Sequence, residues 1–127
     1  MEKIILDTNF LLAISQFKID IFEEISRIAH FSYKLYVFDK TIGELNKLKN
    51  IQKTKLPANI ALAMIKNKNI DIIKTNTAGS VDDILKKQPE NVVIATQDQA
   101  LKKSLKNHTI IGIRQKRYLI LKNRKIY

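Results

Sequence analysis

The feature that most constrains the fold is an alternation between short apolar segments and longer segments with helical spacing. Apolar runs rich in Ile, Leu and Val predict five strands, at residues 3–6, 35–38, 70–73, 92–95 and 109–113. Segments with helical spacing lie between them, at residues 9–15, 20–28, 41–48, 57–65, 81–87 and 97–105. This order predicts an α/β fold: a three-layer α/β/α sandwich around a mostly parallel five-stranded sheet.

The length and composition fit a single domain. We expect one domain over all 127 residues, with 114–127 forming a basic C-terminal tail or an additional edge strand. The chain has no cysteine, which excludes disulfides, zinc–thiolate sites and thiol nucleophiles. No apolar run approaches the roughly 20 residues that cross a bilayer, and Asp7 follows Met1 too closely for a secretory signal. We therefore expect a cytoplasmic protein with no membrane partner.

The strong positive charge favours a polyanionic partner. The formal net charge is +11, from 23 Lys and Arg against 12 Asp and Glu. No acid follows Asp98, whereas the remaining 29 residues hold these basic side chains: Lys102, Lys103, Lys106, Arg114, Lys116, Arg117, Lys122, Arg124 and Lys125. The alternative is a Lys-rich surface that reflects genome composition.

Four acids are predicted to meet at one edge of the sheet. Asp7 follows the first strand, Asp98 follows the fourth, Glu44 is one turn into a helix, and Asp82 opens another. In an open parallel sheet, ligands bind beyond the carboxyl ends of the strands. Two carboxylates about 4 Å apart repel by about 4 kcal/mol at an effective dielectric near 20, so such a cluster needs a cation. Oxygen ligands without cysteine favour one or two Mg²⁺ or Mn²⁺ ions.

Each acid also has a simpler structural explanation. Asp82 or Asp98 alone is more often a helix cap than a ligand, and Asp7 could cap the helix that begins near Asn9. Thr41 and Glu44 have capping-box spacing, so Glu44 could serve only that cap. The ordered set of four acids is more specific than any one of them.

At these acids the chain resembles the PIN-domain ribonuclease family, from residue 4 to about 119. The segments that carry the resemblance are 5–12 (ILDTNFLL), 42–48 (IGELNKL), 81–85 (VDDIL) and 93–98 (VIATQD). Residues 16–22 and 114–116 are similar to the archaeal branch related to the small-subunit-processome nuclease, which processes ribosomal RNA. The resemblance implies endonucleolytic RNA cleavage that leaves 5′-phosphate and 3′-hydroxyl ends. It implies Asp7, Glu44, Asp82 and Asp98 as catalytic metal ligands, with Asp83 as the alternative to Asp82.

Other side chains are expected to support this site. Asn9 and Thr96 are candidates for orienting the ligand carboxylates, or else for ordinary turn chemistry. The basic residues expected to bind RNA are Lys47, Lys49, Lys53, Lys55, Arg114, Lys116 and Arg117. Tyr118 and Tyr127 could stack on bases, and binding should depend steeply on salt. The tail could instead be an edge strand with solvated charges.

The biological role has several alternatives. The substrate would be single-stranded RNA or a ribosomal RNA precursor, and the chain could form a homodimer. A VapC-type toxin with an antitoxin partner would use the same chemistry, and a PIN module without catalysis would only bind RNA. A receiver domain is disfavoured because the third strand ends without Asp. A haloacid-dehalogenase phosphatase is disfavoured because Asp7-Thr8-Asn9 stands where Asp-x-Asp is needed.

Overall fold

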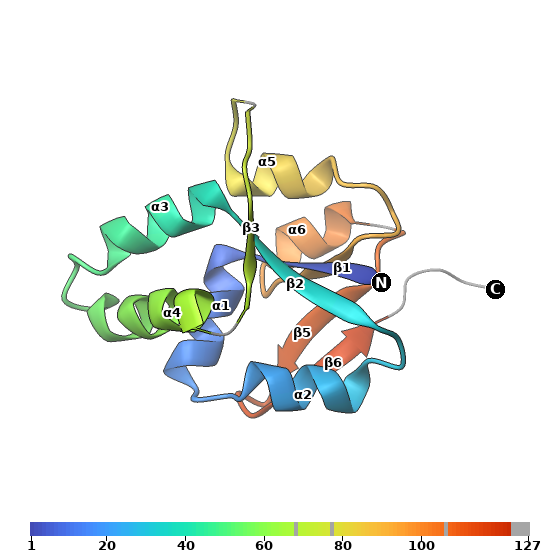
Figure 1. Ribbon diagram of the computed structural model, residues 1–127, viewed down its shortest axis with the longest axis horizontal. Helices are drawn as coiled ribbons and strands as arrows, with labels where there is room; N and C mark the ends of the chain where they lie inside the picture. The colour runs from blue at the N-terminus through green and yellow to red at the C-terminus, as the bar shows by residue number, and fades with distance from the viewer. Residues whose placement is uncertain (68, 77, 106, 123–127) are drawn as a thin grey trace.

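A mixed six-stranded sheet forms the centre of the molecule (Figure 1). The computed structural model describes residues 1–67, 69–76, 78–105 and 107–122. The strands are β1 (Glu2–Leu6), β2 (Tyr33–Phe38), β3 (Asp71–Ile73), β4 (Val93–Ala95), β5 (Ile110–Arg114) and β6 (Tyr118–Lys122). Their order is β3-β2-β1-β4-β5-β6, and every pair is parallel except β5 with β6. The mostly parallel sheet is confirmed, and the additional edge strand brings its size to six.

Helices cover both faces of this sheet, which confirms the three-layer sandwich. They are α1 (Thr8–Gln16), α2 (Ile21–Ile28), α3 (Asp39–Leu48), α4 (Lys55–Asn67), α5 (Val81–Lys86) and α6 (Gln99–Ser104). One hydrophobic cluster joins the sheet to α1, α2, α3 and α4, and a second joins the other face to α5 and α6. In Figure 1, α5 lies above the strands and α2 lies below them.

The central strand β1 is buried on both faces. Ile4 and Leu6 pack into the first cluster, whereas Ile5 between them packs into the second. Successive strand residues point to opposite faces, and this explains why the segment is continuously apolar instead of alternating with polar residues. Ile94 of β4 likewise belongs to the second cluster and is 0% exposed.

The strand order reverses at β1. The chain runs outward from β1 through β2 to β3, and then returns to the other side of β1 to form β4. Connections leave β1 and β4 toward opposite faces at such a reversal, which opens a crevice at the carboxyl ends of these two strands. Asp7 is the first residue after β1, so the fold places its carboxylate at this crevice.

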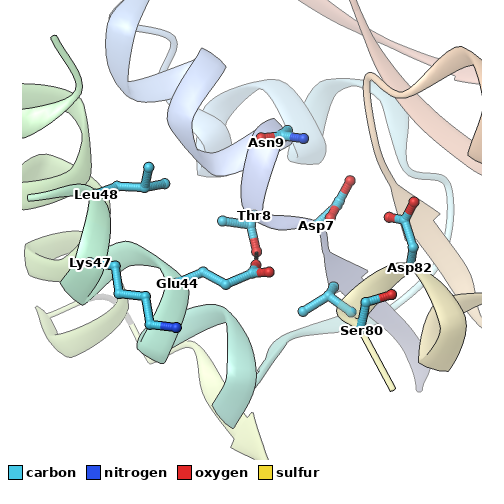
Figure 2. A pocket seen from close by; sticks show the side chains of 9 residues that line it. Asp7, Thr8, Asn9, Glu44, Lys47, Leu48, Ser80 and Asp82 are labelled. Atoms are coloured by element: carbon cyan, nitrogen blue, oxygen red, sulfur yellow. Dashed lines mark hydrogen bonds between the residues drawn. The ribbon is translucent and has the colours of Figure 1, made fainter. Parts of the chain in front are cut away.

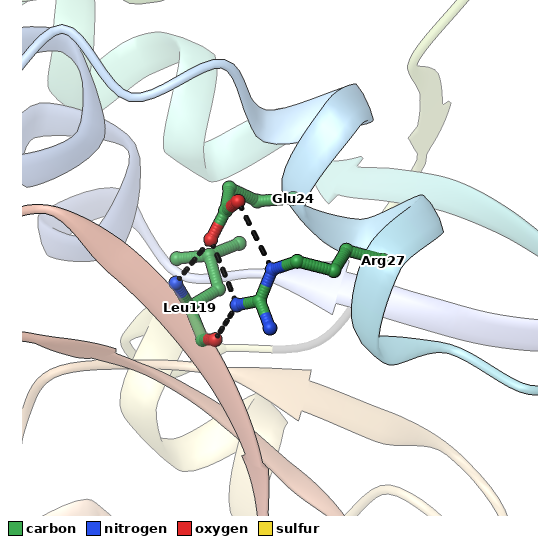
Figure 3. A network of polar contacts seen from close by, with 3 residues as sticks. All are labelled: Glu24, Arg27 and Leu119. Carbon is green, nitrogen blue, oxygen red and sulfur yellow. Dashed lines mark hydrogen bonds and ion pairs between the residues drawn. The ribbon is translucent and has the colours of Figure 1, made fainter.

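The antiparallel strand β6 forms one edge of the sheet and is held there by α2. The backbone N–H of Leu119 donates to Oε1 of Glu24 at 2.8 Å, and Arg27 donates to the carbonyl of Leu119 at 2.7 Å (Figure 3). Arg27 and Glu24 also form an ion pair at 3.0 Å. These side chains occupy the backbone N–H and carbonyl of Leu119, as a neighbouring strand would.

The expected tail at 114–127 is described only in part. Residues 118–122 form β6, while the expected contributions of Arg124, Lys125 and Tyr127 lie outside the described residues. No helix within the described segments is long and apolar enough to cross a membrane.

Candidate functional site

A pocket of about 490 Å³ opens at the carboxyl ends of the central strands (Figure 2). Three separate parts of the chain contribute to it: the junction of β1 with α1, the middle and end of α3, and the start of α5. Its lining residues are Asp7, Thr8, Asn9, Glu44, Lys47, Leu48, Ser80, Val81 and Asp82. The fold therefore gathers three of the four predicted acids around one opening.

Asp7 is the most buried acid of the pocket, with 3% exposure. Its Oδ2 accepts a hydrogen bond of 2.8 Å from the hydroxyl of Thr96, which is fully buried. Burial raises the pKa of Asp7 from 3.8 to about 6; the Thr96 hydrogen bond opposes this shift, and the charges of Asp82 and Glu44 add to it. Asp7 precedes α1 but makes no side-chain cap, so the capping explanation of this residue is wrong.

Glu44 is held by a pair of threonines. The Thr8 hydroxyl donates to Oε1 of Glu44 and lies 3.1 Å from the Thr41 hydroxyl, which is fully buried (Figure 2 draws Thr8 and Glu44). A hydroxyl has one proton, and Thr8 donates its proton to Glu44. Thr41 therefore donates the hydrogen bond between the two threonines. The predicted Thr41–Glu44 capping box is wrong, because β2 leads directly into α3 at Asp39 and Thr41 lies inside the helix.

Asp82 and Asp83 have different surroundings, although they are neighbours in sequence. Asp82 lines the pocket, and its pKa is raised by partial burial and then by the charge of Asp98, with a smaller effect of Glu44. Asp83 instead completes a capping box: it accepts from the N–H of Ser80, whose hydroxyl accepts from the N–H of Asp83. These bonds lower the pKa of Asp83. The geometry favours Asp82 as the pocket acid.

Asp98 lies beside the pocket and also caps α6. Its Oδ1 accepts from the backbone N–H groups of Ala100 and Leu101 at 2.9 and 3.2 Å, so the capping role is present. The hydroxyl of Thr96 connects the two strand ends, because it donates to Asp7 and accepts from the N–H of Asp98 at 3.1 Å. Oδ1 serves the cap, which leaves Oδ2 for a ligand.

Of the described residues predicted to support the acids or to bind RNA, only Asn9 and Lys47 line the acidic pocket. Thr96 orients Asp7 as described, whereas Asn9 is exposed at the pocket opening. Lys47 lines the pocket, and Lys49, Lys53 and Lys55 follow it at the end of α3, in the turn and at the start of α4. The remaining predicted RNA-binding residues are exposed in or beside the β5–β6 turn: Arg114, Lys116 and Arg117.

Sequence reasoning missed the contacts that hold the segment before α5. Asp39, the residue after β2, accepts hydrogen bonds from the Thr75 hydroxyl at 2.7 Å and from the Thr75 N–H at 3.2 Å. The Thr75 contacts are the main reason that the pKa of Asp39 is lowered. Lys40 donates to the carbonyl of Gly79 at 2.6 Å. Only the position of Asp39 directly after a predicted strand could have suggested its role.

The donor set suits a hard divalent cation, although the carboxylates do not converge. The acids supply only oxygen, and the raised pKa values of Asp7 and Asp82 reflect burial and mutual repulsion that a cation would relieve. Across the described segments, no three His, Cys, Asp or Glu side chains lie close enough together to hold one ion. A bound cation would therefore have to draw these side chains inward.

Known proteins share both the sequence pattern and the fold. The family model described as "PIN like domain" matches residues 4–116. Ribonuclease VapC4 of Methanocaldococcus jannaschii is 35% identical over 124 residues, covering 93% of this chain and 95% of that protein. The sequence resemblance stated above is thereby confirmed.

Two solved structures are similar in fold. The PIN domain endonuclease Utp24 has a TM-score of 0.79 and 23% identity, covering 95% of this chain and 91% of that chain. A domain of a functionally unknown protein from Methanocaldococcus jannaschii has a TM-score of 0.61 and 13% identity, covering 90% and 92%. The family match over 4–116 and the 35%-identical relative show that this chain belongs to the PIN like domain family.

Proposed function

We propose that the chain is a metal-dependent endoribonuclease that hydrolyses RNA phosphodiesters to 5′-phosphate and 3′-hydroxyl ends. The observation that carries the proposal is the gathering of Asp7, Glu44 and Asp82 around one pocket, with Asp98 beside it. Gathering carboxylates that repel one another, with Asp7 buried, costs stability, and a module that only binds RNA gains nothing from it. The 35%-identical relative named as a ribonuclease supports the same activity.

The four acids would hold Mg²⁺ or Mn²⁺, and the threonines around them have positioning roles. When bound, such an ion polarises a phosphoryl oxygen and lowers the pKa of its water. Thr96 fixes the direction in which Asp7 presents its free oxygen, and Thr8 fixes Glu44. Asp83 is engaged in the cap of α5, so we assign it no direct contact with the ion.

The basic residues would hold the RNA against this acidic pocket. Lys47 lines the pocket itself and would contact a phosphate of the bound strand, which the carboxylates alone would repel. The other predicted RNA-binding residues lie in two groups, one between α3 and α4 and one at the β5–β6 turn. Cleavage with little base selectivity follows, because contacts to phosphates carry no direct sequence information.

The VapC4 relative favours a toxin-type role over ribosomal RNA processing. In this role we propose that the chain binds an antitoxin, forms a homodimer and acts in the cytoplasm. Ribosomal RNA processing is supported by the resemblance of residues 16–22 and 114–116 to the archaeal branch, while the likeness to Utp24 concerns the fold. Growth arrest on expression, relieved by co-expression of a neighbouring gene, would support the toxin. Unimpaired growth with altered precursor RNA would support processing.

The test compares cleavage of labelled single-stranded RNA in Mn²⁺ and in EDTA, for the native chain and Asp7→Asn. We expect cleavage only with Mn²⁺, and a loss of roughly a thousandfold or more in the variant. RNA affinity should stay equal or rise, because one repelling charge is gone. Glu23→Gln on the exposed side of α2 is the charge-matched control. Retained cleavage by Asp7→Asn would refute the site, and RNA binding without any cleavage would favour an inactive module.

A further inference from the structure

A second, smaller pocket lies between α6 and the β5–β6 ribbon. Its volume is about 240 Å³, and its lining is polar and basic. The residues around it are Gln97, Gln99, Lys102, Ile110, Gly112, Ile113, Arg114, Ile120 and Lys122. No Asp or Glu is among these described lining residues, in contrast to the acidic pocket.

Three separate elements each contribute one cation to this basic pocket. Lys102 comes from α6, Arg114 from the end of β5 and Lys122 from the end of β6. In the antiparallel register Lys122 lies opposite Ile110, and residues directly opposite one another share a face of the sheet. The described lining therefore carries positive charge from three elements, which favours an anionic ligand.

The absence of a side chain at Gly112 makes room for one of these cations. A Cβ built at Gly112 would lie 3.2 Å from Nζ of Lys102 and 3.6 Å from Oε1 of Gln97. The ammonium group therefore rests against the strand where any other residue would occupy the space. Oε1 of Gln97 accepts a hydrogen bond from the backbone N–H of Ile113 at 2.7 Å. This bond fixes the orientation of the Gln97 side-chain amide, whose NH₂ group is then the donor for a ligand.

We propose that this basic pocket binds a phosphate group of the RNA backbone next to the cleavage site. Lys and Arg ammonium and guanidinium groups and amide N–H groups are the donors that a phosphodiester oxyanion prefers. Gln97 and Gln99 line the basic pocket, and Asp98 between them interacts electrostatically with Asp82. An RNA strand that passes from the acidic pocket over Asp98 would continue toward Gln97 and Gln99 of this basic pocket. The assignment rests on the proposed ribonuclease function.

The test measures binding of fluorescein-labelled single-stranded RNA by anisotropy in EDTA, which prevents metal-dependent cleavage. For Lys102→Gln combined with Lys122→Gln we expect affinity to fall about tenfold. The slope of log affinity against log salt should become shallower by about 0.7 for each lost phosphate contact. Gly112→Ala keeps the charge but fills the cradle, so affinity should fall about threefold while the melting temperature is kept. The control is Lys66→Gln on α4, in the opposite layer.

The outcomes separate this pocket from the nuclease proposal. The pocket proposal is wrong if the Lys102/Lys122 variant keeps its RNA affinity and salt slope, or if Lys66→Gln loses as much RNA affinity. This holds even if the native chain cleaves RNA. The expected losses in a chain that never cleaves RNA with Mn²⁺ support the pocket and defeat the nuclease. Inorganic phosphate at millimolar concentration should compete weakly; complete competition would assign the pocket to free phosphate instead. If the native chain binds no RNA, the pocket proposal is wrong.

Discussion

The two walls of the acidic pocket are held in different ways. The inner wall consists of Asp7, Thr8 and Glu44, and it rests on hydroxyl groups of Thr41 and Thr96 that are fully buried. The α5 wall consists of residues 80–82, and it follows β3, a strand of only three residues at the sheet edge.

The two walls differ in the free-energy cost of breaking the hydrogen bonds that hold them. Breaking a buried hydroxyl contact leaves an unsatisfied group, at a cost of about 1–3 kcal/mol, whereas water replaces an exposed contact cheaply. Val81 anchors the α5 wall in the second hydrophobic cluster, but the hydrogen bonds that hold the segment before it are partly buried or exposed, from Thr75 to Asp39 and from Lys40 to Gly79. We therefore expect the inner wall to fix the position of a cation and the α5 wall to move toward it.

The largest expected effect concerns the charge buried in the inner wall. The pKa of Asp7 is about 6 in the fold and 3.8 ordinarily, so the folded state holds the proton more tightly than the unfolded chain. Above pH 6 the carboxylate is charged in both states and destabilises the fold; this penalty, about 3 kcal/mol at most, disappears as pH falls through 6 toward 4. Without metal, stability should rise from pH 7 to pH 5.

Thermal unfolding in EDTA at these two pH values checks this expectation. Asp7→Asn lacks the titrating group, so it should be more stable than the native chain at pH 7 and should respond less to pH. Adding Mn²⁺ at pH 7 should stabilise the native chain and not the variant. Identical pH responses of the two proteins would contradict a costly buried charge.

Removing the brace of Asp7 should have the next largest effect. Thr96→Val keeps the shape but deletes the donor to Asp7 and the acceptor for the N–H of Asp98. We expect Mn²⁺ affinity or cleavage rate to fall by about 10- to 100-fold, the usual loss when a group that orients a metal ligand is removed. Thr96→Ser, which retains the hydroxyl, should recover most of it. Equal losses in Val and Ser variants would point to packing instead.

The brace of Glu44 should matter less, because Glu44 is exposed. Thr8→Val removes the hydroxyl that donates to Glu44 and leaves Thr41 without its neighbour. We expect cleavage to fall by about tenfold, at the lower end for groups that orient ligands. Measured kcat should fall while KM for RNA is kept. Thr8→Ser retains the hydroxyl, so the same loss of cleavage in that variant would contradict the positioning role of Thr8.

The tether of the α5 wall should give the smallest effect. Asp39→Ala removes the acceptor for Thr75, and replacement by water should weaken Mn²⁺ binding by roughly three- to tenfold. Amide hydrogen exchange should accelerate at Thr75 while Ser80, whose N–H donates to Asp83, stays protected. Glu23→Ala is the charge-matched control. Unchanged exchange at Thr75 would mean that the two walls are equally firm.

The sequence predicts best the features that depend only on a short local segment. A continuous apolar run predicts a strand buried on both faces, and an acid directly after it must lie at the sheet edge. Asp7 directly follows β1 and Asp98 comes three residues after β4, so local reasoning predicts both near the sheet edge, and the alternation of elements predicts the layers. The sequence predicts either a basic tail or an edge strand at 114–127, and the pairing of β6 with β5 shows a strand over residues 118–122.

Long-range pairing escaped prediction. The capping-box spacing of Thr41 and Glu44 was real but misleading, because the strand continues into α3 without a loop and buries Thr41. Thr8 reaches Thr41 from 33 residues away, and Asp39 reaches Thr75 across 36 residues. Nothing in a local window distinguishes such threonines from ordinary turn residues. The choice between Asp82 and Asp83 likewise depended on which of them the Ser80 cap engages.

The contact between α2 and β6 has a consequence for how copies of the chain can associate. An outermost strand with unoccupied amides and carbonyls is a template for intermolecular β pairing and for fibrils. Glu24 and Arg27 already satisfy Leu119, the second residue of that strand. The opposite border of the sheet is only three residues long and carries the Lys34–Asp71 ion pair. Both features disfavour recruitment of a foreign strand, so we expect copies of the chain to associate through side-chain surfaces of the helices.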